Sequence, residues 1–328
     1  MQKSLGHGSL QLLFPRPKRC VKPQFMTSTS PIKKTPSNLR LRVIYGVLGA
    51  ALLLGCVWGG PLLFGLFFGA VQVLMLREFY RMMRAGGQRP AVGIGLGAGL
   101  LLFFGTFASI FNTFQQYAAL SSLEALFEAA ENLFNIGLLW RGLAVLLPVI
   151  LLINEMLQWP RHPQPFSNAA TVIFGLLYVS LPMTLLNVVA FGGTGYDPRR
   201  VFALFFLVWA SDIGAYAAGK SFGKHKMAPR ISPGKTWEGW AGGFLLTLAV
   251  GWALQWLLPE LPLAHRLVAA AVVAVFAPLG DLAESMLKRS VGVKDSGSIM
   301  PGHGGLLDRF DAFLLVLPVL ALLQLLVG

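Results

Sequence analysis

Acidic and basic side chains crowd into residues 285–311, SMLKRSVGVKDSGSIMPGHGGLLDRFD, within an otherwise strongly apolar chain. Charges beside a helix of hydrocarbon length are costly and usually serve a function. Acids suit a metal ion and bases suit phosphates, so this mixture indicates a nucleotide or phosphate site. Ion pairs between neighbours, Lys294 with Asp295 and Asp308 with Arg309, are the alternative explanation. The ionisable residues of the stretch are Lys288, Arg289, Lys294, Asp295, His303, Asp308, Arg309 and Asp311.

Carboxylates fall at helical spacing at both ends of this stretch, so each set shares one face of its helix. Pro278 and Gly280 interrupt the upstream apolar run just before the first carboxylate, which favours a polar cavity there. Two such helices meeting at the inner membrane surface would form an oxygen-rich site suited to Mg²⁺. The first set is Asp281 and Glu284, with Ser285 and Lys288 on the same face, and the second set is Asp308 and Asp311.

A further carboxylate lies within an apolar run at WASDIGAYAAGKSFGK, residues 209–224. Asp212, Tyr216 and Lys220 follow i, i+4, i+8 spacing and share one helical face. An aspartate inside a membrane helix is most often functional, and pairing with a nearby base is the alternative. We therefore expect Asp212 to face the same polar site.

The next stretch, residues 220–239, combines bases with hydroxyls and glycines. Its SPGKT segment is not a Walker A loop, because the glycine that opens GxxxxGK[ST] is missing and no strand is predicted before it. We expect Ser232, Pro233 and Gly234 to form a tight turn, with the amides of the next helix directed at phosphate. A basic loop that only fixes membrane topology is the alternative. The polar residues concerned are Lys220, Lys224, Lys226, Arg230, Ser232, Lys235, Thr236 and Glu238.

Composition places these residues in a membrane protein. Of the 328 residues, 55% are hydrophobic and 12% are charged, about half the charged fraction of soluble chains. Several runs approach the ~20 apolar residues that a membrane helix needs. Cys20 in a polar tail and Cys56 in an apolar run indicate no disulfide or cysteine-based metal site. The net charge of +13 does not indicate nucleic acid, because the bases are confined to the tail and a few loops.

The N-terminal tail, residues 1–41, is expected to be disordered. The first 42 residues hold nine Lys and Arg, many Ser, Thr and Pro, and no acid, which is a composition that cannot bury a core. A transit peptide, or a basic arm on an anionic membrane surface, is the functional interpretation. An unstructured extension, with Met26 as the true start, is the alternative.

We predict an all-α integral membrane protein with about nine transmembrane helices. With the N-terminus inside, 23 of the 27 Lys and Arg fall on the inner side, including every lysine. This asymmetry places the N-terminus in the cytoplasm and the C-terminus on the opposite side. The predicted spans are 42–58, 61–83, 91–111, 137–153, 168–191, 200–219, 238–258, 265–287 and 309–327.

These spans divide into two regions. Residues 42–199 hold about five helices and an amphipathic segment, SSLEALFEAAENLFN, expected on the outer side, either along the membrane surface or packed over the bundle. Residues 200–328 form the catalytic region, since they hold nearly all the polar residues described above. The predicted topology brings those residues to one face of the membrane.

The stretch from Ser285 to Asp311 resembles the signature of the phosphatidate cytidylyltransferases, also called CDP-diacylglycerol synthases. Upstream, SDIGAYAAGKSFGK, SPGKTWEGWAGG and GDLAES resemble further motifs of that family in the same order, so the detailed match covers about residues 200–312. Met300 stands where the family usually has Leu, Ile or Phe, which is an apolar replacement. The long basic N-terminus is atypical of the family.

The resemblance implies transfer of a cytidylyl group from CTP to phosphatidic acid, giving CDP-diacylglycerol and pyrophosphate. It further implies an integral membrane enzyme that works among membrane lipids, forms a homodimer and needs Mg²⁺, with a second cation as a candidate. CTP is cytosolic, so the site is expected to face the cytosol of a bacterial-type inner or plasma membrane. A plastid membrane, with the site facing the stroma, is the alternative.

These expectations assign roles to the candidate residues. Because phosphatidate is already anionic, no strong base is needed, and catalysis rests on alignment and charge neutralisation. We expect Asp281 and Asp308 to hold the metal, with Asp311 and Asp212 as further candidate ligands. The expected catalytic set adds Lys288, Arg289 and Lys294, and the expected substrate-binding set is Lys220, Lys224, Ser232, Lys235, Thr236, Glu238, Ser285, His303 and Arg309.

Three other functions compete with this one. A CTP-dependent polyprenol kinase shares the CTP chemistry, but the full pattern of residues 285–311 argues against it. A cation-coupled transporter would place Asp212, Asp281 and Glu284 deep in the bilayer, and no pair of helices suggests an inverted repeat. The alcohol phosphotransferases that consume CDP-diacylglycerol need a DGxxAR motif, which is absent from the sequence.

Overall fold

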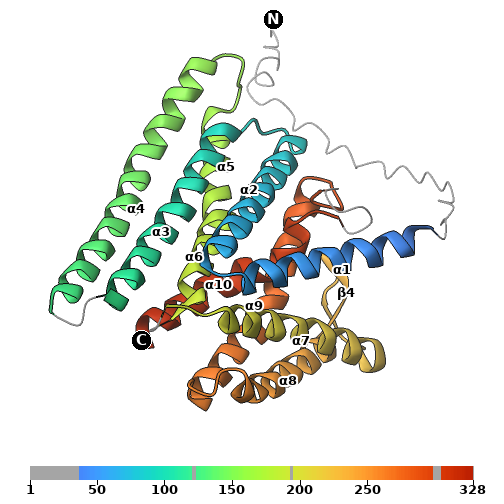
Figure 1. Cartoon of the computed structure of the whole chain (residues 1–328). Coiled ribbons are helices and arrows are strands. Elements are labelled where there is room, and N and C mark those ends of the chain that lie inside the picture. The colour runs from blue at the N-terminus through green and yellow to red at the C-terminus, as the bar shows by residue number, and fades with distance from the viewer. Residues whose placement is uncertain (1–36, 120–122, 193–194, 298–303, 328) are drawn as a thin grey trace, which may run out of the picture. The chain divides into compact units, whose positions relative to one another are not determined.

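The computed structural model describes residues 37–119, 123–192, 195–297 and 304–327, and it describes side chains in all of these except 37–43, 116–119, 123–136 and 325–327. Within that part the chain is mostly helical, as predicted (Figure 1). Most of the predicted tail lies outside the described residues, but its last five residues already belong to a helix. The helices are α1 (Ser37–Trp58), α2 (Pro61–Ala85), α3 (Val92–Ala119), α4 (Leu123–Gln158), α5 (Pro165–Gly175), the π-helical turn η1 (Leu176–Ser180), α6 (Leu181–Ala190), α7 (Pro198–Phe222), α8 (Trp237–Ala253), the 3-10 turn η2 (Leu254–Trp256), α9 (Leu263–Ser290) and α10 (Leu307–Val327).

Six helical segments in the described part are long and apolar enough to cross a membrane, which supports an all-α integral membrane protein. Three further predicted spans are helical, but they differ from these six in length or in charge. The apolar part of α1, Ile44–Trp58, and the 17 residues of α8 extend about 22 Å and about 26 Å, short of a ~30 Å hydrocarbon core. The third, α10, carries three charged residues within its first five positions. The six segments are Pro61–Ala85, Val92–Gln115, Gly137–Gln158, Pro165–Ala190, Pro198–Phe222 and Leu263–Ser290.

Two short antiparallel hairpins add strands that were not predicted. β1 (Phe191–Gly192) pairs with β2 (Gly195–Tyr196), and β3 (Lys226–Ala228) pairs with β4 (Ser232–Thr236). The expected tight turn at residues 232–234 is therefore wrong, because these residues lie in β4 and the turn precedes them. Two-stranded sheets have only edge strands, so a proline is tolerated within β4.

The predicted amphipathic segment and the fourth predicted span form one continuous helix. α4 runs from Leu123 to Gln158 and lies beside α3 (Figure 1). The change in composition near residue 137 thus marks no break in the backbone. The segment extends the axis of a spanning helix and does not form a separate surface element.

Glycines bring α7 and α8 into backbone contact. A Cβ atom added at Gly214 would lie 2.8 Å from the carbonyl oxygen of Gly242, and one at Gly243 would lie 2.7 Å from that of Ser211. Real Cβ atoms do not approach so closely, so larger residues would push the helices apart. Small residues at helix interfaces permit this packing in membrane proteins.

A glycine also brings α9 and α10 into backbone contact. A Cβ atom added at Gly280 would lie 2.5 Å from the carbonyl oxygen of Asp311 and 2.9 Å from the Cα atom of Ala312. Asp281 follows this glycine directly, so the tightest point of the crossing lies beside two of the predicted site carboxylates. The glycine in the predicted helix interruption therefore positions these carboxylates.

An aromatic core links the two predicted regions. The ring of Phe68 in α2 meets that of Phe310 in α10 edge-on at 6.2 Å, and Phe310 meets Phe205 of α7 at 6.4 Å between ring centroids. All three side chains are buried. The start of α10 is therefore packed between a helix of the N-terminal region and a helix of the C-terminal region.

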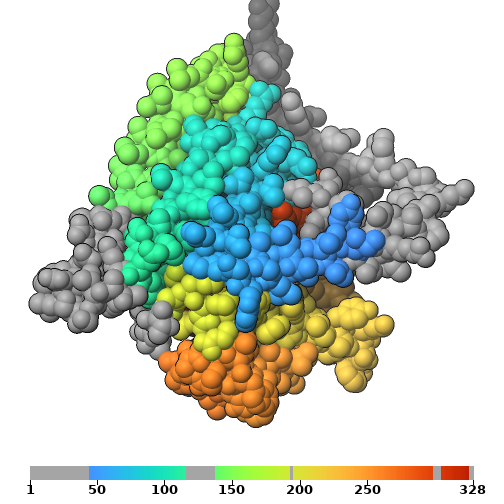
Figure 2. Space-filling view, viewed as in Figure 1, coloured from blue at the N-terminus to red at the C-terminus, as the bar shows by residue number. Residues whose placement is uncertain are grey.

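α1 lies at the surface of the described part, where it contacts α2 and α7 (Figure 2). Val47, Leu48 and Leu52 are exposed, as large apolar side chains facing lipid would be. The end of α1 is tied to the rest by the Tyr196 hydroxyl, which donates to the carbonyl oxygen of Val57 at 2.6 Å. This helix adds an apolar outer layer.

We predict that Gly280→Ala lowers the stability of the protein. The added methyl group would clash with the α10 backbone, and overpacking of this kind costs about 1–3 kcal/mol. Thermal unfolding in detergent, followed by tryptophan fluorescence, should show a lower midpoint. Gly97→Ala is the matched control, since a Cβ there meets nothing within 4 Å. Equal midpoints for the two variants would contradict the proposed role of Gly280.

Candidate active site

A lysine from the β3–β4 hairpin meets the first predicted carboxylate of α9. Lys235 Nζ lies 2.7 Å from Asp281 Oδ2 and donates to the carbonyl oxygen of Pro278 at 2.9 Å. Ser285 Oγ donates to Asp281 Oδ1 at 3.2 Å, as their i, i+4 spacing predicts. This pair brings two of the predicted motifs into direct contact.

The proline in α9 explains part of this geometry. Proline has no backbone N–H, so Pro278 leaves the carbonyl oxygen of Ala274 without its helical donor. The indole Nε1 of Trp240, in α8, donates to that oxygen at 3.2 Å. Lys235 binds the carbonyl oxygen of the proline itself. α9 runs from Leu263 to Ser290 without a break, so the predicted interruption is wrong. Side chains from the hairpin and from α8 instead supply donors to the carbonyl oxygens around Pro278.

Two further carboxylates, from two other helices, interact with this pair. Asp212 of α7 and Asp311 of α10 each interact electrostatically with Asp281 and with Lys235, and they interact with each other. Tyr178, on the π-helical turn η1, interacts with Asp281 and Asp311 as well. The structure thus groups three of the four predicted metal ligands around one lysine.

A cavity of about 410 Å³ opens beside these residues. Asp212 and Asp281 line it, together with polar groups from the hairpin and the end of α7. Lys220 lies over the Tyr216 ring, 5.7 Å from its centroid, within this wall. Carboxylates and lysines in one wall give a pocket that suits a phosphate accompanied by a cation. The lining includes Asp212, Tyr216, Lys220, Lys235, Thr236, Trp240 and Asp281.

A second ionic cluster lies one turn further along α9. Lys288 forms ion pairs with Glu284 and, at 2.7 Å, with Asp308 Oδ1. Asp308 Oδ2 accepts the backbone N–H groups of Ser296 at 3.1 Å and Gly305 at 2.8 Å. In this arrangement Oδ2 of Asp308 holds the backbone at Ser296 and Gly305, and Oδ1 pairs with Lys288.

Sequence analysis missed the buried partner of that loop, Glu78 of α2. Its Oε2 accepts the backbone N–H of Leu307 at 2.9 Å and the hydroxyl of Ser296 at 3.3 Å. Arg81, one turn on, donates from Nη2 to the carbonyl oxygen of Ser296 at 3.1 Å. The signal was present, because an acid inside an apolar span is unusual wherever it occurs.

Two predicted substrate-binding residues organise the start of α8. Thr236 is buried, and its Oγ1 accepts the backbone N–H of Gly239 at 3.1 Å, which caps the helix. Glu238 accepts the backbone N–H groups of Lys224 at 3.1 Å and His225 at 3.2 Å, and it pairs with the His225 ring. In this structure Glu238 holds the end of α7 against the start of α8.

The remaining predicted site residues lie around this centre or outside the described part. Ser232 pairs with Ala228 in the hairpin. Lys224, Arg289, Lys294 and Arg309 are exposed and do not line the cavity. His303 falls outside the described residues, as does Met300. Their assignments therefore stay predictions.

The donor set suits a hard cation. Among the described residues, no three His, Cys, Asp or Glu side chains are arranged to hold a metal ion by themselves. Mg²⁺, however, usually takes one or two carboxylates, with waters and substrate phosphates completing its shell. Asp281, Asp212 and Asp311 supply oxygen atoms only, and two of them line the cavity. These residues fit Mg²⁺ that arrives with a phosphorylated substrate.

We predict that Glu78→Ala loosens the segment before α10. Removing the carboxylate leaves the Leu307 amide and the Ser296 hydroxyl without their acceptor, at a cost of about 1–3 kcal/mol for each buried group left unpaired. Hydrogen–deuterium exchange in detergent should speed up at Ser296, Gly305 and Leu307. Glu78→Gln is the control, since its amide oxygen can still accept. Unchanged exchange in Glu78→Ala would contradict this role.

Known proteins match this chain over nearly its full length. The model of the cytidylyltransferase family matches residues 40–327. The phosphatidate cytidylyltransferase of Bacillus subtilis (strain 168) is 33% identical over 285 residues, covering 86% of this chain and 96% of its own. That of Haemophilus influenzae is 33% identical over 298 residues, covering 85% and 96%. That of Staphylococcus saprophyticus is 42% identical over 159 residues, covering 48% and 60%. With the family model and two relatives extending over most of its length, the chain belongs to the cytidylyltransferase family.

Proposed function

We propose that this chain is a phosphatidate cytidylyltransferase, which makes CDP-diacylglycerol and pyrophosphate from CTP and phosphatidic acid for phospholipid biosynthesis. Relatives of that name cover 96% of their own length in the match. The observation that carries the proposal is the cavity that joins Asp212, Lys235 and Asp281 at the end of apolar helices. A lipid phosphate and a nucleotide phosphate can both reach such a place.

The reaction needs alignment and charge neutralisation. An oxygen of the lipid phosphate attacks the α-phosphorus of CTP, and the bond from that phosphorus to the bridging oxygen breaks to release pyrophosphate. Lys235 and Lys220, in the cavity wall, bind phosphate oxygens and offset the charge that collects there. The N-terminal end of α8, capped by Thr236, adds backbone N–H groups near the same wall.

The proposed metal ligands are Asp281, Asp212 and Asp311. Mg²⁺ bound there would draw charge from the phosphate oxygens and favour the departure of pyrophosphate. Asp308 stays a predicted ligand, although its oxygens contact Lys288 and two backbone amides in this structure. A role for a second cation also stays a prediction.

The proposed setting is a bacterial plasma membrane. Nine spans with the N-terminus inside place the hairpin and the end of α9 on the cytosolic side, where CTP is available. The bacterial relatives and the apolar helices support a multi-pass membrane protein. A homodimer is part of the same proposal, on the strength of the family resemblance alone.

We predict that Asp281→Asn lowers cytidylyl transfer by about 10²-fold or more, because the change removes a carboxylate from the centre of charge neutralisation. The assay combines detergent-purified protein, labelled CTP, phosphatidic acid and a Mg²⁺ titration, and it measures lipid-linked CMP. Glu260→Gln is the control, since Glu260 is an exposed carboxylate that pairs with Arg199 away from the cavity. Full activity of Asp281→Asn at low Mg²⁺ would rule out the proposed ligand set.

We predict that the β3–β4 hairpin and the loop before α9 lie on opposite sides of the membrane. In a background with both native cysteines changed to Ser, Arg230→Cys and Glu260→Cys place single thiols at two exposed positions. An impermeant maleimide should label only the Glu260→Cys variant in right-side-out vesicles and only the Arg230→Cys variant in inverted ones. Labelling of both from one side would exclude the nine-span arrangement.

A further inference from the structure

A second cavity, of about 320 Å³, lies at the other end of the same helices. Its wall is mostly apolar, with leucine the commonest residue, but two arginines, a histidine and a glutamine interrupt it. It is built from α6, α7, η2, α9 and α10, and so shares three helices with the candidate active site. Residues that define it are Arg200, Leu204, Leu207, Leu258, Arg266 and Gln324.

This cavity is separate from the candidate active site. Arg266 and Asp281 both lie on α9, fifteen residues apart in the sequence, which corresponds to about 22 Å along a helix. Arg200 stands at the beginning of α7 and Lys220 at its end. No described residue lines both cavities.

The charge of Arg266 is uncompensated. The residue is 7% exposed, and its Nε is buried without a hydrogen-bond partner among the described residues. Its Nη1 makes one long hydrogen bond, 3.4 Å, to the carbonyl oxygen of Leu258. The structure records no ion pair for it within the described ranges. A buried guanidinium without an anion is costly, so its place in a cavity wall calls for a partner.

Arg200 lies in the same wall without an acidic partner in the described part of the chain. The neighbouring Arg199 behaves differently, since it binds Asp197 at 2.9 Å and Glu260 at 2.7 Å. Asp197, the acid nearest to Arg200 in sequence, and Glu260, the acid nearest to Arg266, are therefore both paired with Arg199. The side chains of Arg200 and Arg266 both line this mostly apolar cavity, where the guanidinium group of Arg200 also lies against Gly192.

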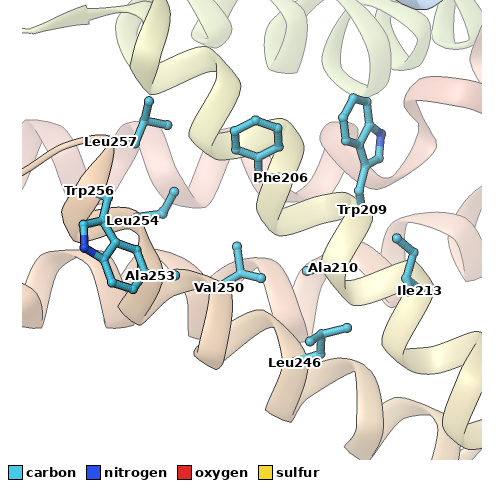
Figure 3. A pocket seen from close by; sticks show the side chains of 10 residues that line it. All are labelled: Phe206, Trp209, Ala210, Ile213, Leu246, Val250, Ala253, Leu254, Trp256 and Leu257. Atoms are coloured by element: carbon cyan, nitrogen blue, oxygen red, sulfur yellow. The ribbon is translucent and has the colours of Figure 1, made fainter. Parts of the chain in front are cut away.

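A third, larger cavity has only apolar residues in its wall and serves as a comparison for the arginine cavity. Figure 3 shows it between α7, with Phe206, Trp209 and Ile213, and α8, with Leu246 and Val250. It contains no charged side chain, so any lipid chain can cover it. The arginine cavity differs because it would distinguish ligands by charge.

We propose that the arginine cavity is a second lipid site, which binds the phosphate of an anionic phospholipid through Arg200 and Arg266. Guanidinium groups bind phosphate oxygens in pairs, and in a dry setting such bonds are strong. The leucines beside them would hold the first part of one acyl chain. The volume is too small for a whole phospholipid, so most of the lipid would lie along the outside of α7 and α9. This site goes beyond the transferase reaction and does not depend on it.

The test is native mass spectrometry of the detergent-purified full chain, titrated with phosphatidylglycerol. We expect one saturable phosphatidylglycerol site that phosphatidylcholine does not fill. The double variant Arg200→Gln/Arg266→Gln should weaken binding about tenfold or more, as loss of charged hydrogen bonds implies. Arg199→Gln is the matched control and should bind like the wild type. Asp281→Asn should also bind like the wild type, which separates this site from the transferase reaction.

A variant that keeps both arginines covers the case in which the double variant misfolds. Ala203→Leu adds bulk to the cavity wall at a buried position, and it should also weaken phosphatidylglycerol binding while the unfolding midpoint stays close to that of the wild type. Equal binding by all variants would overturn the proposal. So would equal filling of the site by phosphatidylcholine, or displacement of the lipid by millimolar inorganic phosphate, which would indicate a site for the free anion.

Discussion

Charge compensation at the edge of an apolar bundle governs the arrangement of this protein. Asp281, Asp212 and Asp311 come from three helices, and carboxylates gathered at such a place repel one another unless a cation joins them. Lys235 provides that cation, with its Nζ 2.7 Å from Asp281 Oδ2, and the β3–β4 hairpin positions this lysine. Lys288 does the same for Glu284 and Asp308 one turn away. Pairs of this kind are adjustable, because an arriving phosphate or metal ion can replace either partner.

Backbone contact between helices is the second condition on which the site depends. Gly280 lets α9 touch α10 beside Asp281 and Asp311, and Gly214 and Gly243 let α7 touch α8. Without these contacts the helices would lie further apart, and so would the carboxylates that they carry. Glycine lowers helix propensity, yet in an apolar bundle its lack of a side chain permits an approach that no other residue allows.

Much of this could be predicted from sequence, and the failures have physical causes. Apolar run length located the helices, and the i, i+3, i+4 spacing correctly predicted the contact of Ser285 with Asp281. The break predicted at Pro278 is wrong, because α9 is continuous there. The donors to the carbonyl oxygens around the proline, Lys235 and Trp240, lie far away in the sequence and follow no local rule. The β3–β4 hairpin was missed because Pro and Gly in SPGKT are typical of turns, and strand pairing depends on a partner strand. Glu78 is an acid at the end of an apolar span, which is unusual, but nothing local identifies the groups that it binds. Its role appears only when α2 packs against the start of α10.

The contact between Glu78 and Leu307 makes the C-terminal part of the chain depend on the N-terminal part. The family signature lies almost entirely in the last third of the chain. This location suggests a catalytic region that could work alone, with N-terminal helices that only attach it to the membrane. Yet a buried carboxylate from the second helix supplies an acceptor that the loop before the last helix cannot obtain from its own half. A piece starting at residue 200 would carry the signature and lack the carboxylate that accepts from Ser296 and Leu307. The two halves are therefore expected to be inherited together and to resist recombination between distant relatives.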